Sequence, residues 1–178
     1  MADLSLQAFD EVINARRTLH GGNRGAPVKL ADGSREGIAL NNACVVMLSS
    51  ALQSFVEEVF LDCSFKAFGR VLVEPELRNY RATWSRWGNP SPSNIVSLFR
   101  RLGVDDVFEG LSWQKQAAGT LKSTLDTINQ VRNCIAHGSA LTVNRQPYSL
   151  QLNNITRWRN TAEQFGKRFQ AHAEAKIR

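Results

Sequence analysis

The chain has 178 residues, of which 43% are hydrophobic, and this composition is typical of a single globular domain with a buried core. The formal net charge of +6, with a sequence pI near 9.7, favours a polyanionic partner such as nucleic acid. Three cysteines without CxxC spacing argue against a disulfide framework or a zinc site, and the N-terminus lacks a signal-peptide pattern, so we expect a cytoplasmic protein.

The first part of the chain predicts two helices joined by a loop. Apolar residues near one face predict a helix over Leu4 to Leu19, and five glycines with a proline predict a flexible loop over about 20–37. A longer helix is expected from Gly37 to about Phe65. Its asparagine, serine and glutamate residues argue against a membrane span, so no membrane partner is expected. Its buried row is predicted at Cys44, Leu48, Ala51, Phe55 and Val59.

The middle of the chain carries weaker signals. Residues Ala67 to Ser91 predict an irregular connection that is rich in arginine and contains Trp84 and Trp87. Those tryptophans either cover the core or stack on RNA bases while the arginines hold phosphate. A capping serine followed by Pro92 then predicts a helix that runs to Gly103.

Two adjacent aspartates, Asp105 and Asp106, follow that helix. Neighbouring carboxylates rarely converge on one cation, and no other oxygen ligands occur at loop spacing. We therefore predict that the pair caps a short turn, and we expect neither a metal site nor a cofactor in this chain.

The helix expected over Leu121 to Gly138 carries the most informative sequence, LKSTLDTINQVRNCIAHG. Small or apolar residues at 118, 121, 125, 128 and 135 form the face of an amphipathic helix that should be buried. Arg132 falls on the same face, where an unpaired guanidinium is costly, so it needs either a partner or a function. Gly138 predicts a left-handed residue after the helix and therefore places His137 at the C-cap.

The end of the chain predicts a turn over Ser139 to Gln146 and a last helix from Pro147 onwards. This helix carries a row of basic residues on its surface, which is either an RNA track or an ordinary solvated face. The whole of residues 1–178 is expected to form one all-α domain, a bundle of about five helices.

The run Arg132 to Gly138, RNCIAHG, resembles the Arg-Asn-x-x-x-His signature of HEPN domains, helical bundles many of which are metal-independent endoribonucleases. The order of other features resembles the RiboL-PSP-HEPN branch: an apolar helix at Val45 to Phe60, Asn89-Pro90, the run Asn94 to Phe99 leading to Leu102 to Val104, and Trp113. Together these features span about Ala39 to Ala140, which is most of the chain.

Metal-free RNA cleavage needs a base for the 2′-hydroxyl, an acid for the leaving 5′-oxygen and a cation for the charged phosphorane. The resemblance implies that His137 transfers protons, that Arg132 binds phosphate, and that Asn133 orients His137 or binds RNA. The product would be a 2′,3′-cyclic phosphate. It also implies a homodimer through the Arg132–His137 helix, so that two motifs face one cleft.

Three further expectations accompany this interpretation. Glu57 is the preferred counter-ion for Arg132, because a buried guanidinium favours a bidentate carboxylate, although Gln53 is also available and Glu57 could equally be solvated. Family analogy suggests a toxin or antiviral defence role with an inhibitory partner protein. The alternative is a catalytically silent HEPN module that binds RNA, a nucleotide or a protein, in which Arg132 is structural and His137 only caps the helix.

Overall fold

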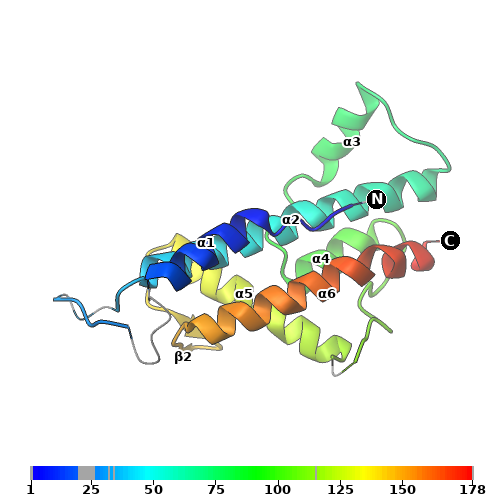
Figure 1. Cartoon of the computed structure of the whole chain (residues 1–178). Helices are drawn as coiled ribbons and strands as arrows, with labels where there is room; N and C mark the ends of the chain where they lie inside the picture. Colours follow the sequence, from blue (N-terminus) through cyan, green and yellow to red (C-terminus); the bar gives the residue numbers. More distant parts are fainter. Residues whose placement is uncertain (1, 20–26, 32, 34, 115, 178) are drawn as a thin grey trace.

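The computed structural model describes residues 2–19, 27–31, 33, 35–114 and 116–177, and it confirms the expected all-α fold (Figure 1). Six helices and one short hairpin occur in this described part. The expected loop over 20–37 lies partly outside the described residues, and His20 lies outside them. The elements are α1 Gln7–Leu19, α2 Ile38–Phe68, α3 Glu76–Trp84, α4 Pro92–Arg100, α5 Ala118–Ala136, β1 Thr142–Val143, β2 Gln146–Pro147 and α6 Leu152–Lys176.

Helix α2 is the centre of the bundle, because it packs against α1, α4, α5 and α6. Four of its five predicted core residues, Cys44, Leu48, Phe55 and Val59, are buried, and Ala51 is half-buried. Residues on other sides of the helix are buried too, as expected for a helix enclosed by four neighbours. Burial raises the pKa of the Cys44 thiol to about 11, so this cysteine behaves as a neutral core residue.

Helix α2 is also long and apolar enough to cross a membrane by length and composition, with a mean hydropathy of 1.5 over its most apolar window. Half of that window is buried inside the fold. The core helix of a bundle meets the same criterion, so the composition of α2 is weak evidence for a membrane span.

Helix α3 lies inside the stretch that we expected to be irregular, so this part of the sequence prediction was wrong. It is only nine residues long, and its aromatic residues Tyr80 and Trp84 pack against the hydrophobic core of the bundle. Trp84 is buried against Phe60 with ring centroids 5.1 Å apart, and the Tyr80 hydroxyl lies 2.8 Å from Ser64 Oγ on α2. Figure 1 shows α3 projecting from one end of the bundle. The spacing Leu77, Tyr80, Trp84 was the signal that could have predicted this helix.

Both ends of the chain also differ from the expected boundaries. Helix α1 begins at Gln7, because the segment before it runs along α6, where the backbone nitrogen of Ala2 donates to Gln170 Oε1 at 2.8 Å. Helix α6 begins at Leu152, five residues after the predicted start. The β1–β2 hairpin lies between α5 and α6, and its turn residues Asn144 and Arg145 have left-handed φ values of 51° and 64°.

Acidification is expected to destabilise the fold through His172. Burial, and then Lys176, lowers the pKa of His172 below its ordinary value of 6.5, and its buried Nε2 has no hydrogen-bond partner among the described residues. The unfolded chain therefore binds this proton more readily, so stability is fully present above pH 6.5 and falls as the pH drops through the folded-state pKa. Urea unfolding at about pH 7.5 and about pH 5.5 should show a smaller loss for His172→Gln than for the natural chain. Equal losses would contradict this assignment.

Candidate active site at the end of helix α5

The C-terminus of α5 has the geometry that the sequence predicts. His137 is the C-cap, and Gly138 follows with a left-handed φ of 62°. The N–H of Ser139 donates to Cys134 O at 2.9 Å and that of Gly138 to Ile135 O at 3.2 Å, which together form a Schellman motif. The helix therefore stays regular through Ala136, and the exposed imidazole of His137 projects from its end.

Arg132 lies on the core side of α5, as expected, but it is only half-buried. At about 100° per residue it is close in direction to the buried residues Leu125 and Ile128. Because Arg132 is near the end of α5, its side chain reaches the edge of the hydrophobic core and is only partly covered. Its guanidinium Nη1 donates to Asn133 Oδ1 at 3.4 Å, which turns the cation toward the face that carries His137. The exposed part of the guanidinium remains accessible to a ligand.

Asn133 links α5 to the loop that precedes α4. Its Oδ1 accepts a hydrogen bond from Asn89 Nδ2 at 3.3 Å as well as the one from Arg132. Asn94 Nδ2 in turn donates to the backbone carbonyl of Asn89 at 3.0 Å and to Asn89 Oδ1 at 3.1 Å. A Cβ at Gly88, whose φ is 100°, would come within 2.7 Å of Asn94 Nδ2, so this close approach requires glycine. Three asparagines thus connect α4, the loop and α5.

The expected ion pair between Glu57 and Arg132 does not form within this chain. Glu57 Oε1 instead accepts hydrogen bonds from Trp87 Nε1 at 2.8 Å and Gln53 Nε2 at 3.2 Å. Among the described residues, Arg132 forms no ion pair with a carboxylate. Glu57 therefore anchors the loop over 85–91 to α2, and it does not hold the guanidinium. Because Trp84 is buried and Trp87 is bound to Glu57, both tryptophans serve the fold.

The β1–β2 hairpin packs beside α5, on the side away from Arg132. Gln130 donates to Asn144 Oδ1 at 3.2 Å and accepts from the backbone N–H of Asn144 at 2.7 Å. The thiol of Cys134 is half-buried against Thr142. Hydrogen bonding to the Thr142 backbone lowers the pKa of Cys134. These contacts fix the last two turns of α5 against the hairpin.

Sequence reasoning assigned Asn89 and Asn94 no role at the site, although Asn89 contacts Asn133 and Asn94 supports Asn89. It did not pair Trp87 with Glu57. Asn89 and Asn94 appeared only as ordered landmarks of the family resemblance. Asp106, predicted to cap a turn, accepts from the Phe108 N–H at 2.9 Å and from Lys122 Nζ at 2.6 Å. No group of three or more metal-binding side chains occurs within the described ranges of the chain.

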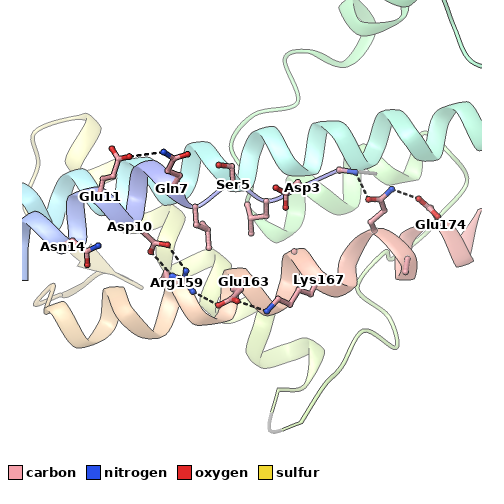
Figure 2. Close-up of a pocket in the computed structure, with 16 residues that line it drawn as sticks. Asp3, Ser5, Gln7, Asp10, Glu11, Asn14, Arg159, Glu163, Lys167 and Glu174 are labelled. Atoms are coloured by element: carbon pink, nitrogen blue, oxygen red, sulfur yellow. Dashed lines mark hydrogen bonds and ion pairs between the residues drawn. The ribbon is translucent and has the colours of Figure 1, made fainter.

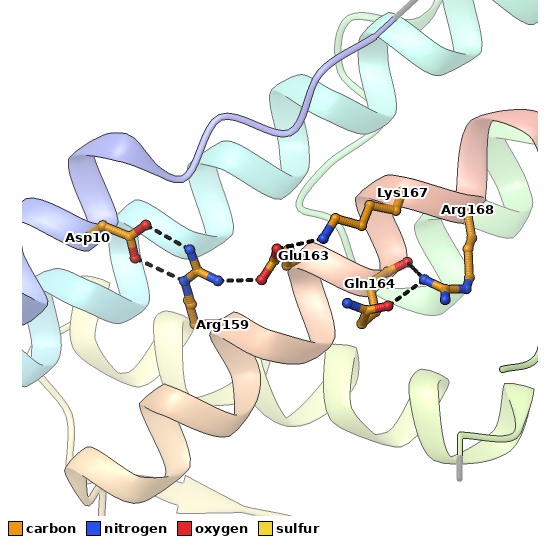
Figure 3. Close-up of polar contacts among 6 residues, drawn as sticks. All are labelled: Asp10, Arg159, Glu163, Gln164, Lys167 and Arg168. Carbon is orange, nitrogen blue, oxygen red and sulfur yellow. Dashed lines mark hydrogen bonds and ion pairs between the residues drawn. The ribbon is translucent and has the colours of Figure 1, made fainter. Parts of the chain in front are cut away.

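A groove of about 910 Å³ lies elsewhere, between the N-terminal segment with α1 and helix α6 (Figure 2). Arg159 donates to both carboxylate oxygens of Asp10, at 2.9 and 2.8 Å, and also pairs with Glu163, which pairs in turn with Lys167 (Figure 3). The hydrogen bonds from Arg159 lower the pKa of Asp10. Since these charges neutralise one another, the groove is a poorer candidate than the end of α5.

A scan against models of protein families, a search of curated proteins and a search of solved structures found no match to this chain.

Proposed function

We propose that this chain is a HEPN-like, metal-independent endoribonuclease that uses Arg132, Asn133 and His137 to cleave RNA. The observation that carries the proposal is the arrangement at the end of α5, where a half-buried guanidinium without a carboxylate partner among the described residues is five residues from an exposed histidine at the C-cap. Arg132 binds the phosphate and stabilises the charge that develops on the phosphorane. His137 transfers the proton of the attacking 2′-hydroxyl or of the leaving 5′-oxygen.

Asn133 holds Arg132 in position through its side-chain oxygen, and Asn89 supports Asn133. The two hydrogen bonds, at 3.3 and 3.4 Å, are long. Catalytic hydrogen bonds in the absence of substrate are often long and shorten when substrate binds. Glu57 supports the site indirectly, because it fixes Trp87 and hence the loop that carries Asn89.

Two copies of the chain form the active cleft in this proposal. Arg132 and His137 are five residues apart, or about 140° around the axis of a helix that remains regular between them. The two side chains therefore leave the helix in different directions within one chain. The facing α5 helices of a homodimer would instead supply two histidines and two arginines to one phosphate. A chain that sediments as a monomer under conditions in which it cleaves RNA would contradict this arrangement.

A toxin or defence role and an inhibitory partner protein follow from the family resemblance alone, and a cytoplasmic site of action follows from the cysteine pattern. Catalysis by the end of α5 requires none of them.

Cleavage without metal ions is the direct test. We expect the purified chain to cleave labelled single-stranded RNA or tRNA in excess EDTA, because the site supplies cationic and proton-transfer groups of its own. The products should end in 2′,3′-cyclic phosphate, which mass spectrometry distinguishes from a 3′-hydroxyl. Cleavage that depends on added magnesium, or products with 3′-hydroxyl ends, would contradict the proposal. An absence of cleavage on both RNAs would favour the silent module that binds without chemistry.

A further inference from the structure

The positive charge of the chain is concentrated in one segment. Residues 69–104 carry six arginines against two glutamates, a balance of +4 out of +6 for the whole chain, and they contain no lysine. The remaining four fifths of the sequence therefore carry only +2. All six arginines, Arg70, Arg78, Arg81, Arg86, Arg100 and Arg101, are exposed.

Half of these arginines already have partners in the fold. Arg70 pairs with Glu76, while Arg100 and Arg101 donate to the backbone carbonyls of Asp105 and Thr83. The Arg101 contact ties the end of α4 to the end of α3 at 3.2 Å. These bonds, with the buried Trp84, give the segment a defined position on the bundle.

The other three, Arg78, Arg81 and Arg86, differ in this respect. Their side chains form no hydrogen bond or ion pair with any residue in the described part of the chain. Arg78 and Arg81 are three apart on α3, so they are neighbours on one helix surface. Arg86 follows the helix, on the loop that leads to Asn89. Exposed cations of one sign without local carboxylates raise the surface potential and attract a polyanion.

This arginine surface is connected to the candidate active site. Arg86 precedes Asn89 by three residues, which corresponds to at most about 11 Å of extended chain. Asn89 contacts Asn133 directly, and Trp87 is fixed to α2 through Glu57. A strand whose phosphate is held at Arg132 can therefore continue along the loop toward α3.

We propose that Arg78, Arg81 and Arg86 form a track that binds the sugar–phosphate backbone of the RNA strand beyond the scissile phosphate. This inference rests on the proposed ribonuclease function and specifies how its substrate is held. Tyr80, Trp84 and Trp87, the described aromatic residues of this segment outside α4, make contacts within the fold and so are poorly placed for base stacking. The substrate class is thus single-stranded RNA bound without base preference, through guanidinium–phosphate contacts that depend steeply on salt.

Binding is measured with the His137→Ala chain, so that no RNA is consumed, and with labelled oligouridylate and oligoadenylate. Replacing Arg78, Arg81 and Arg86 together with glutamine should weaken binding about 10- to 100-fold near 0.1 M salt. The slope of log K against log salt should fall by about 2, because three phosphate contacts are lost. The two homopolymers should bind equally within about threefold.

The matched control replaces Arg17, Lys29 and Arg157 with glutamine, which removes the same charge from α1, the segment before α2 and the start of α6. These elements lie at the end of the bundle opposite α3 (Figure 1). Unchanged binding by the control, with loss in the α3 variant, supports the track. Equal weakening of both variants, no weakening of either, or a strong base preference overturns it. So does arginine-dependent binding to vesicles of anionic phospholipid without binding to RNA. Cleavage in EDTA is measured separately, so the nuclease and the track can fail independently.

Discussion

Replacing His137 with alanine is expected to slow RNA cleavage about 100- to 10,000-fold, the range for the loss of a general acid or base. In the proposed mechanism the imidazole transfers protons that move during the reaction, whereas Arg132 and the track of Arg78, Arg81 and Arg86 bind the strand, so the loss should appear in kcat. His137 is exposed at the C-cap, so the free energy of unfolding should change by no more than about 0.5 kcal/mol. Single-turnover cleavage and denaturant unfolding of the same preparation measure both quantities.

His172→Gln is the matched control, because it removes the other described histidine and keeps a side chain that can donate hydrogen bonds. We expect it to cleave RNA at the natural rate at neutral pH. His137→Asn should be as inactive as His137→Ala, although asparagine is also accepted near helix ends. If His137→Ala retained full activity, His137 would be only a capping residue, and the proposed mechanism would be wrong.

The helices that sequence predicted well are those whose neighbours bury one long apolar face. In α5, Leu121, Leu125 and Ile128 are buried as the spacing requires, and Gly138 ends the helix where its left-handed conformation allows. Helix α3 escaped prediction because its nine residues carry only one short apolar spacing, Leu77, Tyr80 and Trp84. Its stability comes from tertiary contacts of Tyr80 and Trp84 with α2, which a local pattern does not show.

The site shows the same division between local and tertiary information. The positions of Arg132, Asn133 and His137 along α5 follow from helical geometry and could be stated in advance. The partners of those residues could not, because Asn89 is 44 residues from Asn133 in sequence and Trp87 is 30 from Glu57. On electrostatic grounds we expected Glu57 to pair with Arg132. In the structure the Glu57 carboxylate instead accepts a hydrogen bond from the indole N–H of Trp87. The sequence can show that a buried charged residue needs a partner, but it does not show which residue the partner is.

Phe169→Ala is expected to destabilise the fold by about 3–5 kcal/mol, the range for removing a buried phenylalanine ring. Phe169 is fully buried on α6 and contacts four other rings. Its centroid lies 4.4 Å from that of Phe165, 5.5 Å from Phe99, 6.0 Å from Phe108 and 6.3 Å from Phe55. These partners lie on α6, on α4, after α4 and on α2. One truncation therefore opens a cavity where four parts of the fold meet, and urea unfolding measures the loss.

Phe68→Ala provides the comparison, because Phe68 is 44% exposed at the end of α2 and has one ring contact among the described residues, with Tyr80. We expect this variant to lose only about 1 kcal/mol. Below the unfolding transition, Phe169→Ala should still cleave RNA at the natural rate per folded molecule, since its four aromatic partners among the described residues lie on neither α5 nor the loop with Asn89. Equal destabilisation by the two variants would contradict the core placed here around α6. Loss of cleavage by folded Phe169→Ala would mean that the packing of α6 also positions the end of α5.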